Sequence, residues 1–275
     1  MKKKAIVYLL NNNTKDILDF RCSIPLLLKN YLYYYKHDVV CFYENDFPEP
    51  EINYLKSLYG NFLTFVKTEL KKPEYPDEIE KEIPEFFPHP DFPNSRGFPM
   101  GYRNMCRLFS GEIFKKSILE EYSYIWRLDT DSYIMAPIAE DVFDSMEQSK
   151  SPYGFVNIQN DHPGTCLGLW DKCAEYFKEK NPTAFTEENK EKMGRKVFYT
   201  NFEIFDMEFF RSKEYMDFYN FIDESGGIYT KRWGDHIIRF MAMHGLKKIQ
   251  DCLFFKDIHY YHSDFYHDKM TTDNF

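Results

Sequence analysis

The sequence predicts one α/β domain whose helices flank a sheet that contains parallel strands. The chain has 275 residues, of which 43% are hydrophobic and 19% aromatic, enough to bury a substantial core. Short apolar runs alternate with helix-like segments from the first residues onward, a pattern typical of parallel sheets. No segment has the composition of a flexible linker, so we expect a single compact domain over residues 1–275.

The N-terminal part shows the alternation clearly. Residues 5–10, "AIVYLL", predict a strand, and the following "NNNTKD" predicts a turn that opens a helix over residues 16–35. Residues 38–43, "DVVCFY", predict a second strand. Prolines and acids dominate residues 72–99, so we expect an irregular surface segment there.

Further elements follow to the C-terminus. The patterns predict helices over 101–121, 169–178, 211–223 and 235–244, strands over 122–128, 153–158 and 201–207, and a polar loop over 181–194. Gly226 and Gly227 form the stop signal after one helix, and Asp235 is expected as the N-cap of the next.

Charge and composition exclude some classes of protein. The formal net charge of −9 argues against a general nucleic-acid binder, which would present a basic face. The apolar run 5–10 is too short for a signal peptide, and no stretch reaches the length of a membrane span, so we expect a cytoplasmic chain as written. The six cysteines lack metal-binding spacing, and we expect buried thiols rather than disulfides.

The stretch "YIWRLDTDSYI" carries the main candidate site. Asp129 and Asp131 end an apolar strand, and residues two apart on a strand point to the same face. At the carboxyl end of a strand, both carboxylates can converge on Mg²⁺ or Mn²⁺ together with substrate phosphates. Asp also favours turns for its own hydrogen bonds, so capping of a turn is the alternative. Ile134 stands where a calcium loop needs Gly, and Tyr133 does not fit an aspartyl-phosphatase motif.

Two arginines and an acid are further candidates. Arg103 and Arg107 are four residues apart on one helix face, where they can bind a diphosphate, neutralise nearby acids or form a salt-bridged surface. Glu203 shares a strand face with apolar residues, which requires either an ionic partner or a functional role. Asp235 can serve its helix, a site, or both.

Histidines gather near the C-terminus in "KDIHYYHSDFYH". His259, His262 and His267 fall within nine positions. Each is a candidate nitrogen ligand for a metal ion, and each can equally be a hydrogen-bonded structural residue.

Several motifs together resemble the fungal α-1,2-mannosyltransferases of glycosyltransferase family 15. The resemblance lies in "MGYRNMCRLFSG", "YIWRLDTDSYI", "GLWDKCAEYFKEKNP", the long block from "NFEIFDMEFF" to "KRWGDHII", and "KDIHYYH". These motifs span most of residues 100–262, and the N-terminal strand–helix–strand pattern agrees more loosely. At 129–131 the family usually has Glu-Pro-Asp or Glu-Pro-Gly, whereas this chain has Asp-Thr-Asp.

The resemblance implies a fold and a reaction. The fold is GT-A, a Rossmann-like mixed sheet flanked by helices, with the nucleotide-sugar half at about 1–135 and the acceptor half at about 136–275. The reaction is transfer of mannose from GDP-mannose to a mannose-containing glycan or glycoprotein, with retention of configuration and Mn²⁺ (or Mg²⁺) as cofactor. Family members are Golgi proteins with a membrane anchor, so a Golgi-type lumen is expected only if an anchor has been removed.

The resemblance also implies roles for particular residues. Asp129, Asp131 and His262 match the metal-binding positions, and Asp129 and Asp131 also face the diphosphate. Tyr102, Arg103 and Arg107 lie in the donor-site segment. Glu203 matches the candidate nucleophile, and Asp235 matches an acid near the acceptor. A UDP-hexose transferase, a non-catalytic sugar-binding relative and, more remotely, a metal-dependent phosphatase are the alternatives.

Overall fold

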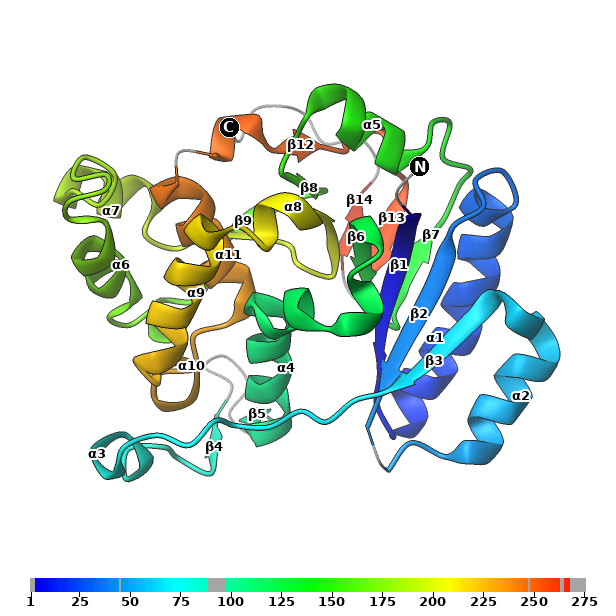
Figure 1. Cartoon of the computed structure of the whole chain (residues 1–275), viewed down its shortest axis with the longest axis horizontal. Coiled ribbons are helices and arrows are strands. Elements are labelled where there is room, and N and C mark those ends of the chain that lie inside the picture. The colour runs from blue at the N-terminus through cyan, green and yellow to red at the C-terminus, as the bar shows by residue number, and fades with distance from the viewer. Residues whose placement is uncertain (1–2, 45, 89–96, 247, 263–264, 268–275) are drawn as a thin grey trace.

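The computed structural model describes residues 3–44, 46–88, 97–246, 248–262 and 265–267. A seven-stranded mixed sheet forms its centre, with helices on both faces (Figure 1). β11 is antiparallel to both of its neighbours, and the other neighbouring strands run parallel. The strand order is β12 (Leu253–Phe254), β8 (Tyr153–Phe155), β11 (Phe202–Asp206), β6 (Tyr122–Leu128), β1 (Lys3–Leu10), β2 (Asp38–Tyr43), β3 (Leu63–Lys67). The predicted α/β fold with a mixed sheet is confirmed.

β1 shows why these residues form a central strand. Residues 5–10 are all buried. Ile6 and Tyr8 pack into the core on one face of the sheet, and Ala5 and Val7 pack into the core on the other. A strand buried on both faces has a continuous apolar sequence, as "AIVYLL" does.

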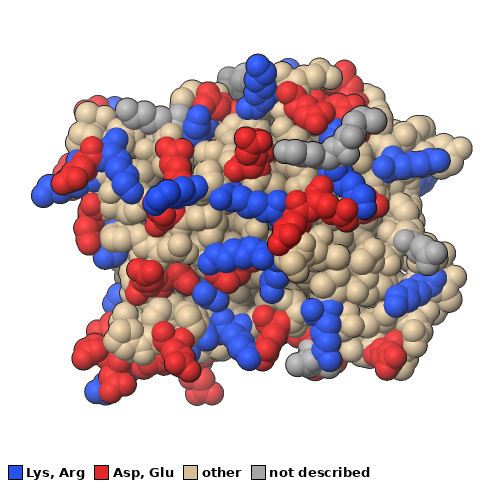
Figure 2. Space-filling view, in the orientation of Figure 1, with Lys and Arg blue, Asp and Glu red and all other residues tan. Residues whose placement is uncertain are grey.

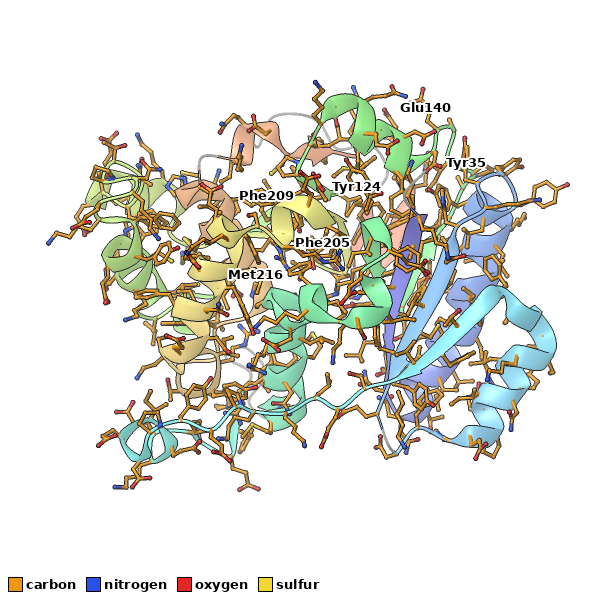
Figure 3. The ribbon with its side chains drawn as sticks, in the orientation of Figure 1. Tyr35, Tyr124, Glu140, Phe205, Phe209 and Met216 are labelled. Atoms are coloured by element: carbon orange, nitrogen blue, oxygen red, sulfur yellow. The ribbon has the colours of Figure 1, made fainter. Side chains whose placement is uncertain are left out.

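Helices cover both faces of the sheet. On the face of Ile6 and Tyr8 lie α1 (Thr14–Leu27), α2 (Glu49–Tyr59) and α5 (Val142–Ser149). On the other face lie α4 (Met100–Ser110), α6 (Leu169–Phe177), α8 (Met207–Phe210), α9 (Lys213–Glu224), α10 (Gly227–Thr230) and α11 (Asp235–Gly245). Side chains fill the space between the layers, and Phe205 of β11 lies among them (Figure 3). The result is a three-layer arrangement.

Small elements complete the chain. A three-stranded sheet joins β7 (Ser132–Ile134), β13 (Tyr260–His262) and β14 (Phe265–His267), and two pairs join β9 (Ile158–Asn160) with β10 (Lys196–Phe198) and β4 (Phe86–Phe87) with β5 (Phe98–Pro99). The remaining α-helices are α3 (Asp77–Glu80) and α7 (Glu187–Met193), and a π-helical turn, Leu28–Leu32, continues α1. Short 3-10 helices are Gly60–Phe62, Glu112–Lys115, Ser117–Leu119, Pro163–Thr165 and Ile249–Asp251. The predicted strand 153–158 is thus split between β8 and β9.

Two predicted elements are wrong in extent. The helix predicted over 101–121 ends at Ser110, because Gly111 lies against the ring of Tyr219 and leaves the helix there. A Cβ at Gly111 would lie 2.3 Å from that ring. The polar loop predicted over 181–194 contains α7, whose N-cap Thr186 accepts from the N–H of Asn189 at 3.2 Å. α7 buries no residue, so its sequence carries no apolar periodicity.

Surface and thiol features are simple. All six cysteines are free thiols, as predicted. Cys41, Cys106 and Cys173 are buried as predicted, whereas Cys22 is exposed and Cys166 and Cys252 are partly exposed. Within the described ranges, every helix is too short or too polar to cross a membrane. On the face shown in Figure 2, Lys and Arg side chains alternate with Asp and Glu side chains. This face therefore has no broad surface of a single sign.

Candidate active site

The two aspartates of "LDTD" lie in the turn that joins β6 to β7. The N–H of Ser132 donates to the carbonyl of Asp129 at 3.0 Å, and the N–H of Asp129 donates to Ser132 Oγ at 3.1 Å. The backbone and the Ser132 hydroxyl thus close the turn. The carboxylates of Asp129 and Asp131 contact basic side chains, Arg127 and Lys15 respectively. Their arrangement fits the binding of positive charge better than capping of the turn.

His262 is brought to Asp131 by strand pairing. β13 is antiparallel to β7, with His262 opposite Ser132, the residue after Asp131. His262 Nε2 consequently lies 2.9 Å from Asp131 Oδ1. Both side chains remain partly accessible, with 13% of His262 and 16% of Asp131 exposed. Asp131 and His262, remote in sequence, therefore form one site at the carboxyl end of β6.

The ring of His262 has hydrogen-bond partners on both of its nitrogens. Its Nδ1 lies 2.9 Å from the hydroxyl of Tyr199, and its Nε2 lies 2.8 Å from Asn201 Nδ2. Nε2 therefore faces both the Asn201 amide and the Asp131 carboxylate. A protonated Nε2 donates to Asp131, whereas a deprotonated Nε2 presents a lone pair there, and a cation is then needed between the two acceptors. The Tyr199 contact on the other nitrogen fixes the ring, as partners of metal-binding histidines do.

Asp129 stands slightly apart from this pair. Its Oδ1 accepts from Arg127 Nε at 3.1 Å, and its Oδ2 lies 3.4 Å from Asn201 Nδ2. No group of three His, Cys, Asp or Glu side chains is gathered as a ready metal site among the residues that the structure describes. The structure thus places two of the three predicted metal ligands together and the third beside them. The side chain of His267 lies outside the described residues.

A buried ionic network lies next to Asp129. Arg127 Nη1 donates to Glu203 at 3.0 Å and to Asp235 at 2.5 Å, and its guanidinium lies 3.7 Å from the ring centre of Phe109. Arg239 Nε donates to the other oxygen of Glu203 at 3.2 Å. The carboxylate of Glu203 also accepts from Tyr153 at 2.7 Å.

The network explains the carboxylate on an apolar strand face. Glu203 is 0% exposed, so its charge is compensated by two guanidiniums rather than by water. Burial raises the pKa of Glu203, against the opposing charges of Arg239 and Arg127. Burial also acts to raise the pKa of Asp235, but the charge of Arg127 prevails and holds that pKa well below its usual range. Asp235 is therefore an ionised partner of Arg127.

The prediction that Asp235 is the N-cap of its helix is wrong. Gly234 occupies the N-cap position of α11, without a side-chain hydrogen bond, and Asp235 is the first helical residue. Its carboxylate is turned to Arg127 because that guanidinium is buried beside it. Arg127 was not among the predicted site residues, although an arginine within the apolar run "YIWRL" was the available signal.

The two predicted donor-site arginines face away from Arg127. Met105 and Phe109 contact Arg127 from one side of α4. Arg103 and Arg107 are each two residues from Met105, which is about 200° around a helix. Arg107 pairs with Asp223 at 2.8 Å, which matches the salt-bridged alternative.

Arg103 is a buried structural residue in this arrangement. Its guanidinium donates to the carbonyls of Tyr229, Pro84 and Glu85 at 2.7–2.8 Å, and the residue is 1% exposed. These contacts tie the irregular segment 72–88 to α4 and α10. The structure therefore does not bring Arg103 or Arg107 to the aspartates.

A cleft of about 340 Å³ opens at the carboxyl ends of β1 and β2. Its walls include Asn11 and Asn13 after β1, Glu44 after β2, and Tyr102 and Met105 of α4. The chain passes from β1 to β2 and β3 on one side and then crosses back to β6 on the other side of β1, so the strand order reverses at β1. Ligands of open α/β sheets bind at this kind of switch point. Tyr102 is the member of the predicted donor-site segment that lines the cleft.

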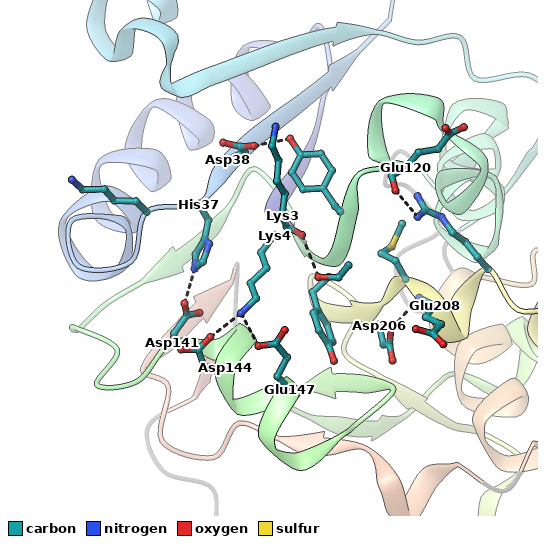
Figure 4. A pocket seen from close by; sticks show the side chains of 16 residues that line it. Lys3, Lys4, His37, Asp38, Glu120, Asp141, Asp144, Glu147, Asp206 and Glu208 are labelled. Atoms are coloured by element: carbon teal, nitrogen blue, oxygen red, sulfur yellow. Dashed lines mark hydrogen bonds and ion pairs between the residues drawn. The ribbon is translucent and has the colours of Figure 1, made fainter. Parts of the chain in front are cut away.

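A larger cavity, of about 1070 Å³, lies at the opposite end of the sheet (Figure 4). Its charged groups are largely paired with one another: Lys4 contacts Asp144 at 2.7 Å and Glu147 at 3.2 Å, and His37 contacts Asp141 at 2.7 Å. Because ligands of this architecture bind at the carboxyl ends of the strands, the smaller cleft is the candidate site.

Comparison with solved structures defines the class of protein. The structure of the mannosyltransferase Ktr4p from Saccharomyces cerevisiae in complex with GDP aligns with a TM-score of 0.82 and 26% identity. The alignment covers 99% of this chain and 74% of that chain. The fold is therefore that of a glycosyltransferase, and the predicted GT-A class is confirmed.

Sequence comparison then gives the family. The chain belongs to the family described as "Glycolipid 2-alpha-mannosyltransferase", whose profile matches residues 1–273. Probable mannosyltransferase KTR3 of Saccharomyces cerevisiae is 33% identical over 184 residues, covering 64% of this chain and 45% of the relative. Glycolipid 2-alpha-mannosyltransferase 1 of Candida albicans is 32% identical over 178 residues, covering 62% and 41%. The matched region thus spans less than half the length of these relatives.

Proposed function

We propose that this chain is a retaining, metal-dependent mannosyltransferase that transfers mannose from GDP-mannose to a mannose-containing glycan. The observation that carries the proposal is the approach of Asp131 to His262, 2.9 Å apart at the carboxyl end of β6. The names of the relatives and the GDP complex of Ktr4p support the donor and the linkage. Residues 1–135 would hold the donor and residues 136–275 the acceptor.

The residues present fit a divalent metal ion. Asp131 and His262 would hold it, with Asp129 at its edge, and substrate phosphates would complete its coordination, as is usual when a protein supplies few ligands. A carboxylate together with an imidazole suits Mn²⁺ better than Mg²⁺, because Mg²⁺ prefers oxygen ligands. When bound, the metal would neutralise the charge of the leaving diphosphate.

Groups on α1 would help to hold that diphosphate. The N-terminal turn of α1 borders the cleft, and Asn13 caps it by accepting from the N–H of Asp16 at 2.9 Å. A helix N-terminus favours anions. Lys15, in the same turn, lies 3.4 Å from Asp131 and is mostly exposed, so it can reach a phosphate beside the metal. Lys15 was not among the predicted site residues.

The burial of Glu203 helps to decide by which mechanism the anomeric configuration is retained. Both of its oxygens are engaged by Arg127, Arg239 and Tyr153, and the residue is 0% exposed. A nucleophile must reach the anomeric carbon, so we infer that Glu203 positions Arg127 and that the reaction follows a front-side route. Asp235, ionised against Arg127 and with a lowered pKa, is a weak base for the same reason. A glycosylated Glu203 peptide, trapped during turnover without acceptor, would contradict this inference.

Donor screening is the first experiment. Binding of GDP and UDP with and without Mn²⁺ is measured by calorimetry, and transfer to methyl α-mannoside is measured with GDP-mannose and UDP-hexoses. We expect GDP to bind in the presence of Mn²⁺ and GDP-mannose to be turned over. Preference for a UDP-sugar would overturn the donor assignment, and nucleotide binding without any transfer would favour a non-catalytic sugar-binding relative.

The metal assignment is tested separately. In Asp131→Ala, Mn²⁺-dependent GDP binding should weaken at least about tenfold, because one of few charged ligands is lost. Asp144→Ala, at the opposite end of the sheet, is the matched control and should bind GDP like the wild type. Equal Mn²⁺-dependent GDP affinity in Asp131→Ala and wild type would refute the assignment.

A further inference from the structure

Arg232 occupies a backbone position that suits glycine. Its φ is 61°, in the left-handed region, directly after α10. Trp233 N–H donates to the carbonyl of Gly227, six residues earlier, at 3.3 Å, so the chain turns back on α10 around Arg232. A glycine would adopt this conformation without strain, whereas a residue with a Cβ is strained there. The presence of arginine here indicates that its side chain is used.

The side chain of Arg232 is buried but poorly satisfied. The residue is 7% exposed, and its guanidinium lies 3.8 Å from the ring centre of Phe98. Nη1 lies 3.5 Å from Asp161 Oδ2, and Nη2 donates to the hydroxyl of Tyr102 at 3.2 Å. Nε has no hydrogen-bond partner among the described residues. A guanidinium has five N–H donors, and buried donors are normally paired with an acceptor. The unpaired donors of Arg232 can therefore bind oxygen acceptors of a ligand.

Asp161, the acid beside this guanidinium, is held firmly. Its Oδ2 accepts from Thr165 Oγ1 at 2.6 Å and lies 2.8 Å from His236 Nε2. Burial acts to raise its pKa, but the contact with His236 prevails and the pKa is well below the usual range. Asp161 is therefore an ionised acceptor with a fixed orientation next to a guanidinium with spare donors.

The position of this pair relates it to the cleft. Tyr102, which accepts from Arg232, also lines the cleft at the ends of β1 and β2. His236, which contacts Asp161, follows Asp235 of the buried network in the chain. Contacts thus connect the pair to Tyr102 at the cleft and, through His236, to Asp235, which lies 3.9 Å from His236 Nδ1.

We propose that Arg232 and Asp161 together bind adjacent hydroxyl groups of the acceptor sugar. One hydroxyl oxygen accepts from the guanidinium, and a neighbouring hydroxyl donates to the carboxylate. Phe98 and Tyr102 fix the plane of the guanidinium. This inference rests on the proposed transferase function, because it assigns the second substrate of that same site.

The test uses Arg232→Asn, since asparagine tolerates a positive φ and keeps the backbone. Asp161→Asn is the second variant. Loss of a hydrogen bond to a charged group corresponds to a roughly 10- to 100-fold weaker interaction, so both variants should raise the KM for methyl α-mannoside by that factor. The Kd for GDP in Mn²⁺ should stay within about twofold of wild type in both variants.

A matched control and a direct binding measurement complete the design. Arg211→Lys alters a guanidinium that contacts the carbonyls of Phe114 and Leu119 at the opposite end of the sheet, and it should leave both constants unchanged. Binding of methyl α-mannoside to each protein with GDP and Mn²⁺ is followed by saturation-transfer NMR, which requires no turnover.

The outcomes separate this inference from the proposed function. Wild-type protein that turns over no GDP-mannose defeats the proposed function, while NMR still decides whether Arg232 binds the saccharide. Normal saccharide binding and an unchanged acceptor KM in a folded Arg232→Asn would overturn the inference alone. A parallel loss of GDP affinity would also overturn it, because it would place Arg232 in the donor site or in the fold.

Discussion

Replacing Glu203 by glutamine should destabilise the fold measurably. The substitution keeps the shape of the side chain and removes its charge. Glu203 lies 3.0 Å from Arg127 Nη1 and 3.2 Å from Arg239 Nε, and it is fully buried. Glutamine would turn an amide N–H₂ group toward a guanidinium, so that donors face donors in a site without water.

The magnitude follows from the number of charges left. Breaking a buried ion pair from one side costs about 3–5 kcal/mol. The lower value, about 3 kcal/mol, is appropriate because Asp235 and Asp129 still compensate Arg127. For 275 residues, the unfolding entropy near the transition is about 0.6 kcal/mol/K, so the melting temperature should fall by about 5 °C.

The assay is thermal unfolding at pH 7 without nucleotide, with Glu188→Gln as the control. Glu188 is also a carboxylate paired with a basic side chain, Lys192 at 2.6 Å, but 75% of its side chain is exposed. An exposed pair contributes at most about 1 kcal/mol, so this control should shift the melting temperature by less than about 2 °C. A change below about 1 °C in Glu203→Gln would refute the reasoning that the network stabilises the buried carboxylate.

Two further predictions concern packing and pH. Gly111→Ala should destabilise the protein by about 1–3 kcal/mol, because the new Cβ would lie 2.3 Å from the Tyr219 ring. Gly101→Ala is the control and should be neutral or stabilising, because no atom lies within 4 Å of the new Cβ. Equal melting temperatures of the two variants would contradict this prediction. Burial acts to lower the pKa of His236, but the contact with Asp161 prevails and raises that pKa. The ion pair of His236 with Asp161 therefore contributes fully to stability below about pH 6.5, and this contribution is lost as the pH rises through the pKa of His236 in the folded state. Denaturant titrations from pH 6 to pH 9 should therefore show a smaller decline in His236→Asn than in wild type, and equal slopes would count against the ion pair.

Much of the fold could be predicted because its strands are buried on both faces. "DVVCFY" and the strand 122–128 have the predicted bounds as β2 and β6, since continuous apolar runs end at charged residues. The end of α4 could not be predicted in this way. Gly111 leaves the helix because of Tyr219, a contact made only after the chain has folded. α7 was missed because its helix buries no face.

The residues of the candidate site were also predictable only in part. Asp129 and Asp131 follow an apolar strand, so their place at its carboxyl end was readable from local sequence. The face of α4 that points to the site was not readable, because Arg103 and Arg107 form a plausible helix stripe by themselves. Which stripe faces Arg127 depends on the packing of Met105 and Phe109.

The pairing of β13 with β7 has a consequence for how metal binding and folding are linked. β13 pairs with β7 and β14, and its Tyr260 is buried in the core. Docking of β13 brings His262 to Asp131 and closes the chain between them into a loop, at an entropic cost. A cation held by Asp131 and His262 would bind only the docked form and would stabilise it by mass action. Metal occupancy and docking of the C-terminal strand are then one linked equilibrium, visible as slower amide hydrogen exchange in residues 260–262 when Mn²⁺ and GDP are present.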